Sequence, residues 1–270
     1  MPFRRFSRRT DSPATAIVSG AASGFGRAIV NRLAADGWLV AAIDLPEPLA
    51  AADLPHSVLR HPGDVRDADF WRAVHDRLRT DWQSLELLVN AAGVGATGEV
   101  GTLPEAQWRR VLDTNLLGTA LACETFLPWL RATEGRSHLV NMASIAAILA
   151  PPAMAAYAAS KAGVVAISEA IAAECPPGRP GVTVACPGFF RSGLLDSWHF
   201  GDHLQRLEAN RRMTTTAWTS ERVADRVLAA VERNRRYVVV GAQARWLWRL
   251  KRLAPQTTTA LVRALYRRLT

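Results

Sequence analysis

The sequence predicts an α/β protein with a doubly wound, seven-stranded parallel sheet flanked by helices. Short apolar runs alternate with segments of helical spacing along most of the 270 residues. The runs are apolar throughout, which is typical of strands covered on both faces of a parallel sheet. A glycine-rich segment follows the first run, where such a fold turns from strand to helix.

The first half of the chain supplies four predicted strands and two predicted helices. The strands are runs of five or six residues rich in Val, Ile, Leu and Ala, and the third is the weakest. The segments between them repeat apolar residues at helical spacing. The predicted strands are 14–19, 39–43, 57–61 and 85–90, and the predicted helices are 24–36 and 67–80.

The second half continues the alternation with three more strands. A long insertion, residues 189–218, separates the sixth strand from the last helix and strand. In sheets of this kind ligands bind beyond the carboxyl ends of the strands, so those positions are the candidates for function. The predicted strands are 137–142, 182–186 and 237–240, and the predicted helices are 104–131, 154–175 and 220–233.

Composition excludes several classes of protein. Hydrophobic residues make up 49% and charged residues 21%, as in a folded globular domain. The three cysteines lie far apart without metal-binding spacing, which predicts reduced thiols, no metal site and a cytoplasmic location. No apolar stretch has the length of a transmembrane helix.

The net charge of +9 belongs to the two ends of the chain. Residues 1–12 hold four arginines and one aspartate, and residues 241–270 hold seven basic residues and no acidic one. The body of the protein is therefore not a nucleic-acid surface. This pattern predicts a basic N-terminal arm over 1–12, a dinucleotide-binding catalytic domain over 13–241 and a basic C-terminal extension over 242–270.

The glycine-rich segment is SGAASGFG, residues 19–26, with glycines at 20, 24 and 26. Between a strand and a helix, such glycines let the backbone and the positive helix end approach a pyrophosphate. Asp44 ends the second strand, 18 residues past Gly26. A carboxylate there would bond a ribose and repel a 2′-phosphate, which favours NAD over NADP. Alternatively, Asp44 caps the turn that follows.

The segment YAASK, residues 157–161, contains one of only two lysines among 33 basic residues. In a helix, Tyr157 and Lys161 lie on one face, four residues apart. A cation beside a phenol favours its ionised form and prepares it for general acid/base work. The plain alternative is an ordinary tyrosine with a solvated lysine one turn later.

Other pieces follow the later strands in order: Gly63-Asp64-Val65, NAAG at 90–93, Asn115, Ser144 and Pro187-Gly188. With the segments 19–26 and 157–161, they resemble the short-chain dehydrogenase/reductase family. The resemblance is to its compact single-domain form, with a Rossmann-type fold, over roughly residues 14–241. Ser192 stands where the family usually has a threonine that meets the nicotinamide carboxamide.

The resemblance implies four catalytic side chains. Tyr157 would exchange a proton with the carbinol or carbonyl oxygen, and Lys161 would lower the pKa of Tyr157 and bind the nicotinamide ribose. Ser144 would hydrogen-bond the same substrate oxygen, and Asn115 would hold a water in a proton relay. The implied activity is NAD(P)-dependent interconversion of a secondary alcohol and a carbonyl, by a homodimer or homotetramer.

The resemblance also implies the cofactor contacts. Asp64 and Val65 would contact adenine, and Asn90 would line the cofactor cleft. The predicted cofactor-binding residues are Gly20, Ser23, Gly24, Phe25, Gly26, Asp44, Asp64, Val65, Asn90, Ala91, Gly93, Tyr157, Lys161, Pro187, Gly188 and Ser192.

Two apolar segments, residues 145–155 and the lid at 189–218, would cover the substrate. Few charges would face such a pocket, which favours a lipophilic alcohol or ketone. Alternatively, these side chains only pack the lid against the body. The predicted substrate contacts are Ser144, Ile145, Met154, Phe190, Leu195 and Trp198.

The C-terminal extension reads as two basic amphipathic helices. Trp246, Leu247, Leu250 and Leu253 fall on one face of the first, among arginines. Basic amphipathic helices with tryptophan bind anionic membrane surfaces, which would place the protein at the inner membrane face. Packing on a partner subunit or on the substrate cleft is the alternative.

Two rival functions remain open. A catalytically silent nucleotide-binding protein could act at a membrane through its basic ends, but it would need none of the aligned catalytic side chains. A sugar-nucleotide epimerase is disfavoured by the glycine spacing, GxxxGxG, and by the short C-terminal region. The sequence therefore favours an NAD-dependent oxidoreductase.

Overall fold

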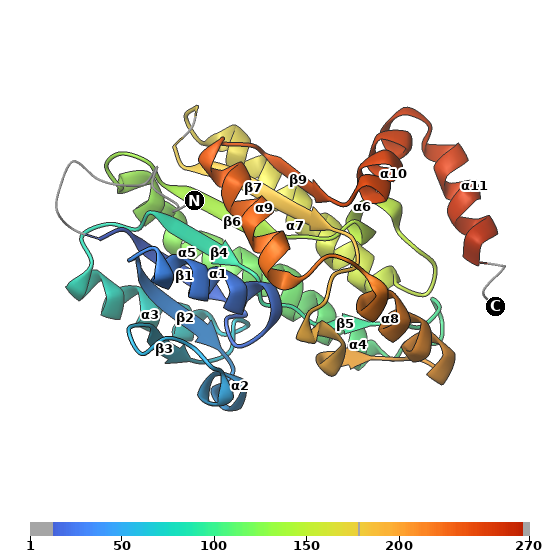
Figure 1. Cartoon of the computed structure of the whole chain (residues 1–270), viewed down its shortest axis with the longest axis horizontal. Coiled ribbons are helices and arrows are strands. Elements are labelled where there is room, and N and C mark those ends of the chain that lie inside the picture. Colours follow the sequence, from blue (N-terminus) through green and yellow to red (C-terminus); the bar gives the residue numbers. More distant parts are fainter. Residues whose placement is uncertain (1–12, 178, 267–270) are drawn as a thin grey trace.

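The computed structural model describes residues 13–177 and 179–266; the predicted arm at 1–12 lies outside them. Seven parallel strands form one sheet in the order β3-β2-β1-β4-β6-β7-β9 (Figure 1), as predicted. The strand order reverses between β1 and β4, where doubly wound folds bind ligands. The strands are β1 (Thr15–Ser19), β2 (Leu39–Asp44), β3 (Leu59–Pro62), β4 (Leu87–Asn90), β6 (His138–Met142), β7 (Gly181–Pro187) and β9 (Tyr237–Val240).

Helices cover both faces of this sheet. On one face α1 packs against α9, and on the other α3, α5 and α7 lie side by side. A short helix, α2 (Pro46–Ala51), packs on β2 and β3 at the sheet edge. The helices that cover the two faces are α1 (Gly24–Ala35), α3 (Ala68–Asp81), α5 (Gly118–Ala132), α7 (Ala155–Glu174) and α9 (Ser220–Glu232).

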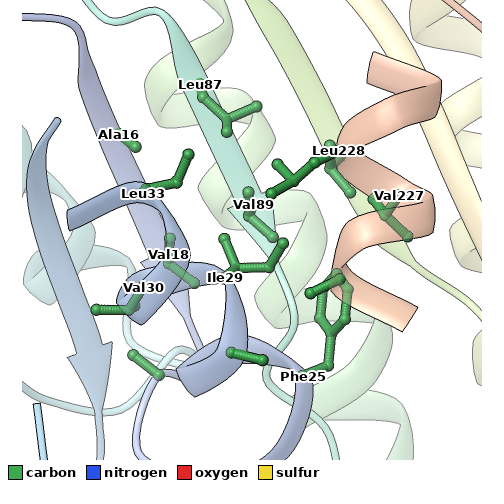
Figure 2. Close-up of a cluster of buried hydrophobic side chains, with 14 of the residues drawn as sticks. Ala16, Val18, Phe25, Ile29, Val30, Leu33, Leu87, Val89, Val227 and Leu228 are labelled. Carbon is green, nitrogen blue, oxygen red and sulfur yellow. The ribbon is translucent and has the colours of Figure 1, made fainter. Parts of the chain in front are cut away.

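Alternate residues of the central strands feed two separate cores. In β1, Ala16 and Val18 point to the α1 and α9 side, whereas Ile17 points to the α3, α5 and α7 side. Figure 2 shows the first core, where Ile29 of α1 and Val227 of α9 lie close to the central strands. Because both faces are buried, the three central positions of β1, Ala16, Ile17 and Val18, are all apolar, and this is the pattern that predicted the fold.

The helix predicted over 104–131 is interrupted. It begins as α4 (Glu105–Leu112), widens into a π-helical turn over Asp113–Leu117 and continues as α5. Such π turns are frequent at functional sites. This turn contains Asn115, one of the predicted catalytic residues.

The insertion at 189–218 is more structured than its sequence suggested. It holds a 3-10 turn (Gly193–Ser197), a short strand β8 (Trp198–His199) and a helix α8 (His203–Thr215). In α8 only Met213 is buried, so the helix lacks the apolar periodicity that would have revealed it. β8 pairs with β5 (Gly95–Ala96) in a separate two-stranded sheet.

The C-terminal extension forms α10 (Ala242–Leu253) and α11 (Pro255–Tyr266) beside the main sheet (Figure 1). α10 packs on β9, and both helices contact the short helix α6 (Ala146–Leu149) that follows β6. The predicted apolar face is only partly covered, since Trp246 is 57% and Leu253 86% exposed. Within the described residues, no helix is both long and apolar enough to span a bilayer.

Candidate active site

The glycine-rich turn packs against the loop that follows β4. Gly20 has φ +67°, and a Cβ there would lie 2.6 Å from the amide nitrogen of Ala92. A Cβ on Gly26 would overlap the carbonyl oxygen of Gly20. Ser19 accepts a hydrogen bond from the Ala91 amide, 3.2 Å away. Only glycine permits this close approach, so the turn is a backbone-lined cradle.

The residues of this cradle fit a dinucleotide pyrophosphate. Ser23 precedes α1 but makes no side-chain cap in the described structure, and the first turn contains no acidic residue. The helix therefore presents its amides and positive dipole end without a competing carboxylate. Gly24, with φ +52°, approaches Ser192 of the lid: a Cβ on Gly24 would lie 3.1 Å from Cβ of Ser192. Phe25 is buried in the first core.

Asp44 ends β2, and its carboxylate accepts hydrogen bonds from two backbone amides. Its Oδ1 accepts a bond from the amide of the next residue, Leu45, 2.9 Å away, but no side chain caps the helix α2 that follows. Its Oδ2 accepts a bond from the Ala22 amide, also at 2.9 Å. The carboxylate thus fixes the glycine-rich turn while lying at the end of β2, where a ribose would bind.

A cleft of about 460 Å³ opens beside Asp64. Arg66 pairs with Asp64, with 2.5 Å between Nη2 and Oδ2, and this bond lowers the pKa of the Asp64 carboxyl. Val65 is buried against Gly118, where a Cβ would lie 2.9 Å from its Cγ2. The sequence interpretation missed Arg66, which follows Gly63-Asp64-Val65 directly. The cleft is lined by Asp64, Arg66, Asp67, Asp113 and Leu117.

The predicted place of Asn90 in the cofactor cleft stays a prediction, and the structure shows where its side chain lies. The side chain is buried, and its Nδ2 donates to Oδ1 of Asn141 at 2.9 Å. Asn141 in turn donates to Ser168 of α7 at 2.9 Å. The sheet faces decide this outcome, because Asn90 falls on the strand side that faces α5 and α7. Asn90 therefore links β4 to β6 and, through Asn141, to α7.

Asn115 holds the loop after NAAG in place. Its Oδ1 accepts a bond from the Val94 amide at 2.8 Å, and its Nδ2 donates to the Val94 carbonyl at 2.9 Å. Nδ2 also donates to Ser160 of α7 at 3.0 Å. Gly93 fits beside it, where a Cβ would lie 3.2 Å from Oδ1 of Asn115 and 3.4 Å from Nζ of Lys161. The predicted water relay through Asn115 stays a prediction.

Tyr157 and Lys161 are buried together on α7, and the Lys161 Nζ lies 6.0 Å from the Tyr157 ring centroid. Burial raises the pKa of Tyr157 to about 12, against an opposing effect of the Ser144 side chain. Burial lowers the pKa of Lys161 to about 8. The prediction that Lys161 would lower the tyrosine pKa is thus not met, because the cost of removing a phenolate from water dominates. Nζ instead donates to the Met142 carbonyl at 2.8 Å.

Ser144 and Pro187 shape the floor around this pair. Ser144 follows β6, and its Oγ accepts a bond from the Ala146 amide at 3.1 Å, which starts α6. The Pro187 carbonyl accepts a bond from the Ile145 amide at 2.9 Å, so the ends of β6 and β7 are joined. Cys186, just before Pro187, lies near Lys161, and burial raises the pKa of its thiol to about 12. Sequence spacing gave no signal for Cys186.

The lid brings some predicted substrate contacts to Tyr157 but not others. Trp198 lies over Tyr157 with ring centroids 4.9 Å apart, and Met154 belongs to the same apolar cluster. Phe190 packs instead with Trp218 against the other core, beside α9. Phe190 therefore belongs to a different cluster from Tyr157, and its predicted substrate contact stays a prediction. Ile145 and Leu195 are half-buried.

Comparisons with known proteins show the family to which the chain belongs. A family model described as short chain dehydrogenase matches residues 14–200. The 2-(R)-hydroxypropyl-CoM dehydrogenase of Xanthobacter autotrophicus is 31% identical over 237 residues, which cover 83% of this chain and 93% of that protein. "Probable oxidoreductase EphD" of Mycobacterium tuberculosis is 27% identical over 260 residues, which cover 91% of this chain. The chain spans only 44% of the length of EphD.

Solved structures share the fold over nearly the whole chain. A short chain dehydrogenase/reductase from Burkholderia phymatum, in complex with NAD, has a TM-score of 0.82 and 25% identity, and the match covers 91% of this chain and 95% of that one. A short chain dehydrogenase from Burkholderia cenocepacia, in complex with NADP, has a TM-score of 0.78 and 24% identity, with coverage of 97% and 99%. With a family model matching most of its length, this chain belongs to the short-chain dehydrogenase/reductase family of oxidoreductases.

Proposed function

We propose that this protein interconverts a lipophilic secondary alcohol and the corresponding carbonyl, with NAD as its preferred cofactor and Tyr157 as general acid/base. The observation that carries the proposal is the meeting of Tyr157, Lys161 and Ser144 beside the glycine-rich cradle. The bound nicotinamide would supply or accept the hydride. The chain must then orient the substrate and move one proton.

Tyr157 is suited to the proton step in the direction of reduction. With its pKa raised to about 12, it is protonated at neutral pH and can donate its proton to a carbonyl oxygen. Ser144 would hydrogen-bond the same oxygen and hold it toward the phenol. Lys161, with its pKa lowered to about 8, is largely cationic at neutral pH. Its charge would stabilise the phenolate left after proton transfer.

The preference for NAD is argued from Asp44 and its neighbour. A carboxylate at the end of β2 accepts bonds from ribose hydroxyls and repels a 2′-phosphate. Leu45 follows it, where an arginine could have neutralised that phosphate. The carboxylate already bonds two backbone amides, which hold it in position for this selection.

The lipophilic character of the substrate is argued from the surroundings of Tyr157. Apolar side chains from four separate segments cluster around it. Such walls favour apolar groups next to the reacting carbon. The partly buried members of this cluster are Val94, Leu103, Trp108, Met154 and Trp198.

A titration of the purified protein with NADH and with NADPH, followed by cofactor fluorescence, tests the proposal first. Tighter binding of NADH, with consumption of NADH when lipophilic ketones are added, is the expected result. Tighter binding of NADPH would overturn the role of Asp44. Cofactor binding without turnover of any ketone or alcohol would support the silent nucleotide-binding alternative.

A second activity, association with an anionic membrane surface, is favoured by the exposed face of α10. Trp246 and Leu253 are exposed seven residues apart, hence on one side of the helix, with Arg245 and Arg249 exposed beside them. Residues 241–270 contain no acidic side chain to neutralise the arginines. Such a face combines apolar insertion with attraction to anionic headgroups.

Co-sedimentation with vesicles tests this second activity. The protein is expected to bind phosphatidylglycerol vesicles and not phosphatidylcholine vesicles, and the double change Trp246→Ala with Leu253→Ala should release it. Leu204 and Leu207 on α8 are also exposed, 73% and 52%, so the double change Leu204→Ala with Leu207→Ala is a suitable control. If the full chain binds neither vesicle, a partner subunit is the better occupant for this face.

A further inference from the structure

The side chain of Arg110 joins two segments of the chain that lie far apart in sequence. Its Nη2 donates to the Gly95 carbonyl at 2.9 Å, and its Nη1 donates to the Ser197 carbonyl at 3.0 Å. Nε donates to Gln107 on the same helix at 3.0 Å, which fixes the plane of the fork. A rigid guanidinium fork can hold two carbonyls at once, whereas a lysine ammonium is a single point of charge.

The two carbonyls belong to β5 and to the turn that leads into β8. In the paired sheet, Gly95 lies opposite Trp198 and Ala96 opposite His199. The Thr97 amide extends the pairing with a bond to the His199 carbonyl at 2.8 Å. A Cβ on Gly95 would overlap the Trp198 ring, so the indole lies directly against the glycine backbone.

The position of Trp198 places its ring over the proposed acid/base. The rings of Trp198 and Tyr157 are 4.9 Å apart and tilted by 49°. Phe200 stacks beyond Trp198, with centroids 6.2 Å apart. In the proposed function, a group on the reacting carbon that lies on the side of the lid would therefore pack against the indole.

We infer that Trp198 determines substrate specificity by limiting the size of one group on the reacting carbon, and that Arg110 is the positioning residue that holds Trp198 there. This inference rests on the proposed function for the location of the substrate. It deepens that function to a substrate class: carbonyl compounds with one small substituent, such as a methyl ketone, and one larger apolar substituent.

Binding of three octanones that differ only in the position of the carbonyl tests the role of Trp198. Affinities are measured by the fluorescence of NADH bound to a Tyr157→Phe variant, so the result does not depend on turnover. The methyl ketone is expected to bind best. Trp198→Ala should raise the affinity for the propyl ketone relative to the methyl ketone by about tenfold, the effect of added methylenes in an apolar pocket. Trp198→Phe should change the ratio less.

Gly95→Ala provides a second route to the same result, because the new methyl group displaces the indole without altering it. The same shift in the affinity ratio is expected. An unchanged ratio in both Trp198→Ala and Gly95→Ala would overturn the inference. Failure of all three ketones to bind the NADH complex would also overturn it, whereas binding without turnover in the wild-type protein would instead contradict the proposed reaction.

Amide hydrogen exchange tests the role of Arg110 independently of any substrate. Arg110→Met should speed exchange at residues 193–199 and shift the ketone ratio in the direction of Trp198→Ala, and Arg110→Lys should restore part of the protection. Arg109→Met is the matched control, since Arg109 is the preceding residue on α4 and pairs only locally with Glu105 in the described structure. Normal exchange in Arg110→Met, or an equal effect in Arg109→Met, would refute the proposed positioning of Trp198 by Arg110.

Discussion

Burial shifts the pKa values of Tyr157 and Lys161 in opposite directions. Removal from water disfavours the charged form, which raises the pKa of Tyr157 and lowers that of Lys161. Both effects bring the pair toward its neutral state. The hydrogen bond with the Ser144 side chain lowers the pKa of Tyr157 and so partly offsets the effect of burial. A cofactor bound in the cradle would therefore meet a protonated tyrosine beside a lysine close to its titration point.

At the residue scale, Tyr157→Phe is expected to reduce turnover by about 10²- to 10⁴-fold, the usual contribution of general acid/base catalysis. The substitution removes only the hydroxyl, so the ring contact with Trp198 should persist. NADH affinity, measured by fluorescence, should stay close to that of the wild-type protein. Unchanged turnover in a purified variant would rule out the proposed proton transfer.

A second prediction concerns Asp44, which bonds two backbone amides and, in the proposed function, also selects NAD over NADP. Asp44→Asn removes the charge but keeps an oxygen for one of the amides of Ala22 and Leu45. The ratio of the NADPH to the NADH dissociation constant is expected to fall, because the repulsion of the 2′-phosphate is lost. Asp44→Ala should lower stability as well, by about 1 kcal/mol for each hydrogen bond lost with the Ala22 and Leu45 amides. A constant ratio in Asp44→Asn would contradict the selective role.

At the scale of elements, the site depends on close contacts between connecting segments that follow different strands. The glycine-rich turn after β1 meets the loop after β4, and the lid meets both the turn and α4. Asn115, in the π turn, accepts a hydrogen bond from the Val94 amide and donates one to the Val94 carbonyl. The cleft described above is lined by the segment after β3 and by the π turn itself, which contributes Asp113 and Leu117.

Gly20→Ala tests the first of these connections. The new methyl group would approach the Ala92 amide at a positive φ, so both stability and NADH affinity should fall. Gly37→Ala is a matched control: its φ is +82°, but nothing lies within 4 Å of the added carbon. The control should lose about 1 kcal/mol of stability from backbone strain and keep its NADH affinity. Equal loss of NADH affinity in both variants would argue against the cradle.

At the scale of the whole molecule, one buried histidine links stability to pH. His138 starts β6, is 1% exposed, and bonds Thr183 at 2.8 Å. Burial lowers its pKa to about 3 from an ordinary value of 6.5. Above pH 6.5 the ring is neutral in both the folded and the unfolded state, and no penalty arises. Below pH 6.5, His138 is protonated in the unfolded chain but stays neutral in the folded protein down to about pH 3.

The free energy of unfolding should therefore fall by about 1.4 kcal/mol per pH unit between pH 6.5 and 3 from this group alone. His138→Gln is expected to be less stable at pH 7 but to lose less stability on acidification. His56→Gln, at an exposed position, should keep the wild-type pH slope. Urea unfolding at several pH values measures the three slopes, and equal slopes in all three proteins would contradict the assignment.

The sequence was sufficient for most of the fold because the relevant signals are local. Strands buried on both faces need apolar residues throughout, and the predicted run at 237–240 matches β9 residue for residue. The glycine turn likewise needs glycine wherever the backbone must approach itself, so Gly20, Gly24 and Gly26 could be identified by spacing alone. α8 escaped prediction because an exposed helix carries no apolar period.

Burial, and contacts between distant segments, were decided only by the tertiary structure. Whether Lys161 or desolvation controls the phenol of Tyr157 depends on how much water the fold removes, which no local pattern encodes. The sequence does not distinguish Arg110 from the other arginines. Only the folded chain places the Gly95 and Ser197 carbonyls within hydrogen-bond distance of its guanidinium group. Local sequence determined where the strands end and which glycines turn. Long-range packing determined which side chains face Tyr157. Trp198 reaches the tyrosine because its strand pairs with Gly95, about a hundred residues earlier in the chain, and such pairing forms only in the folded protein.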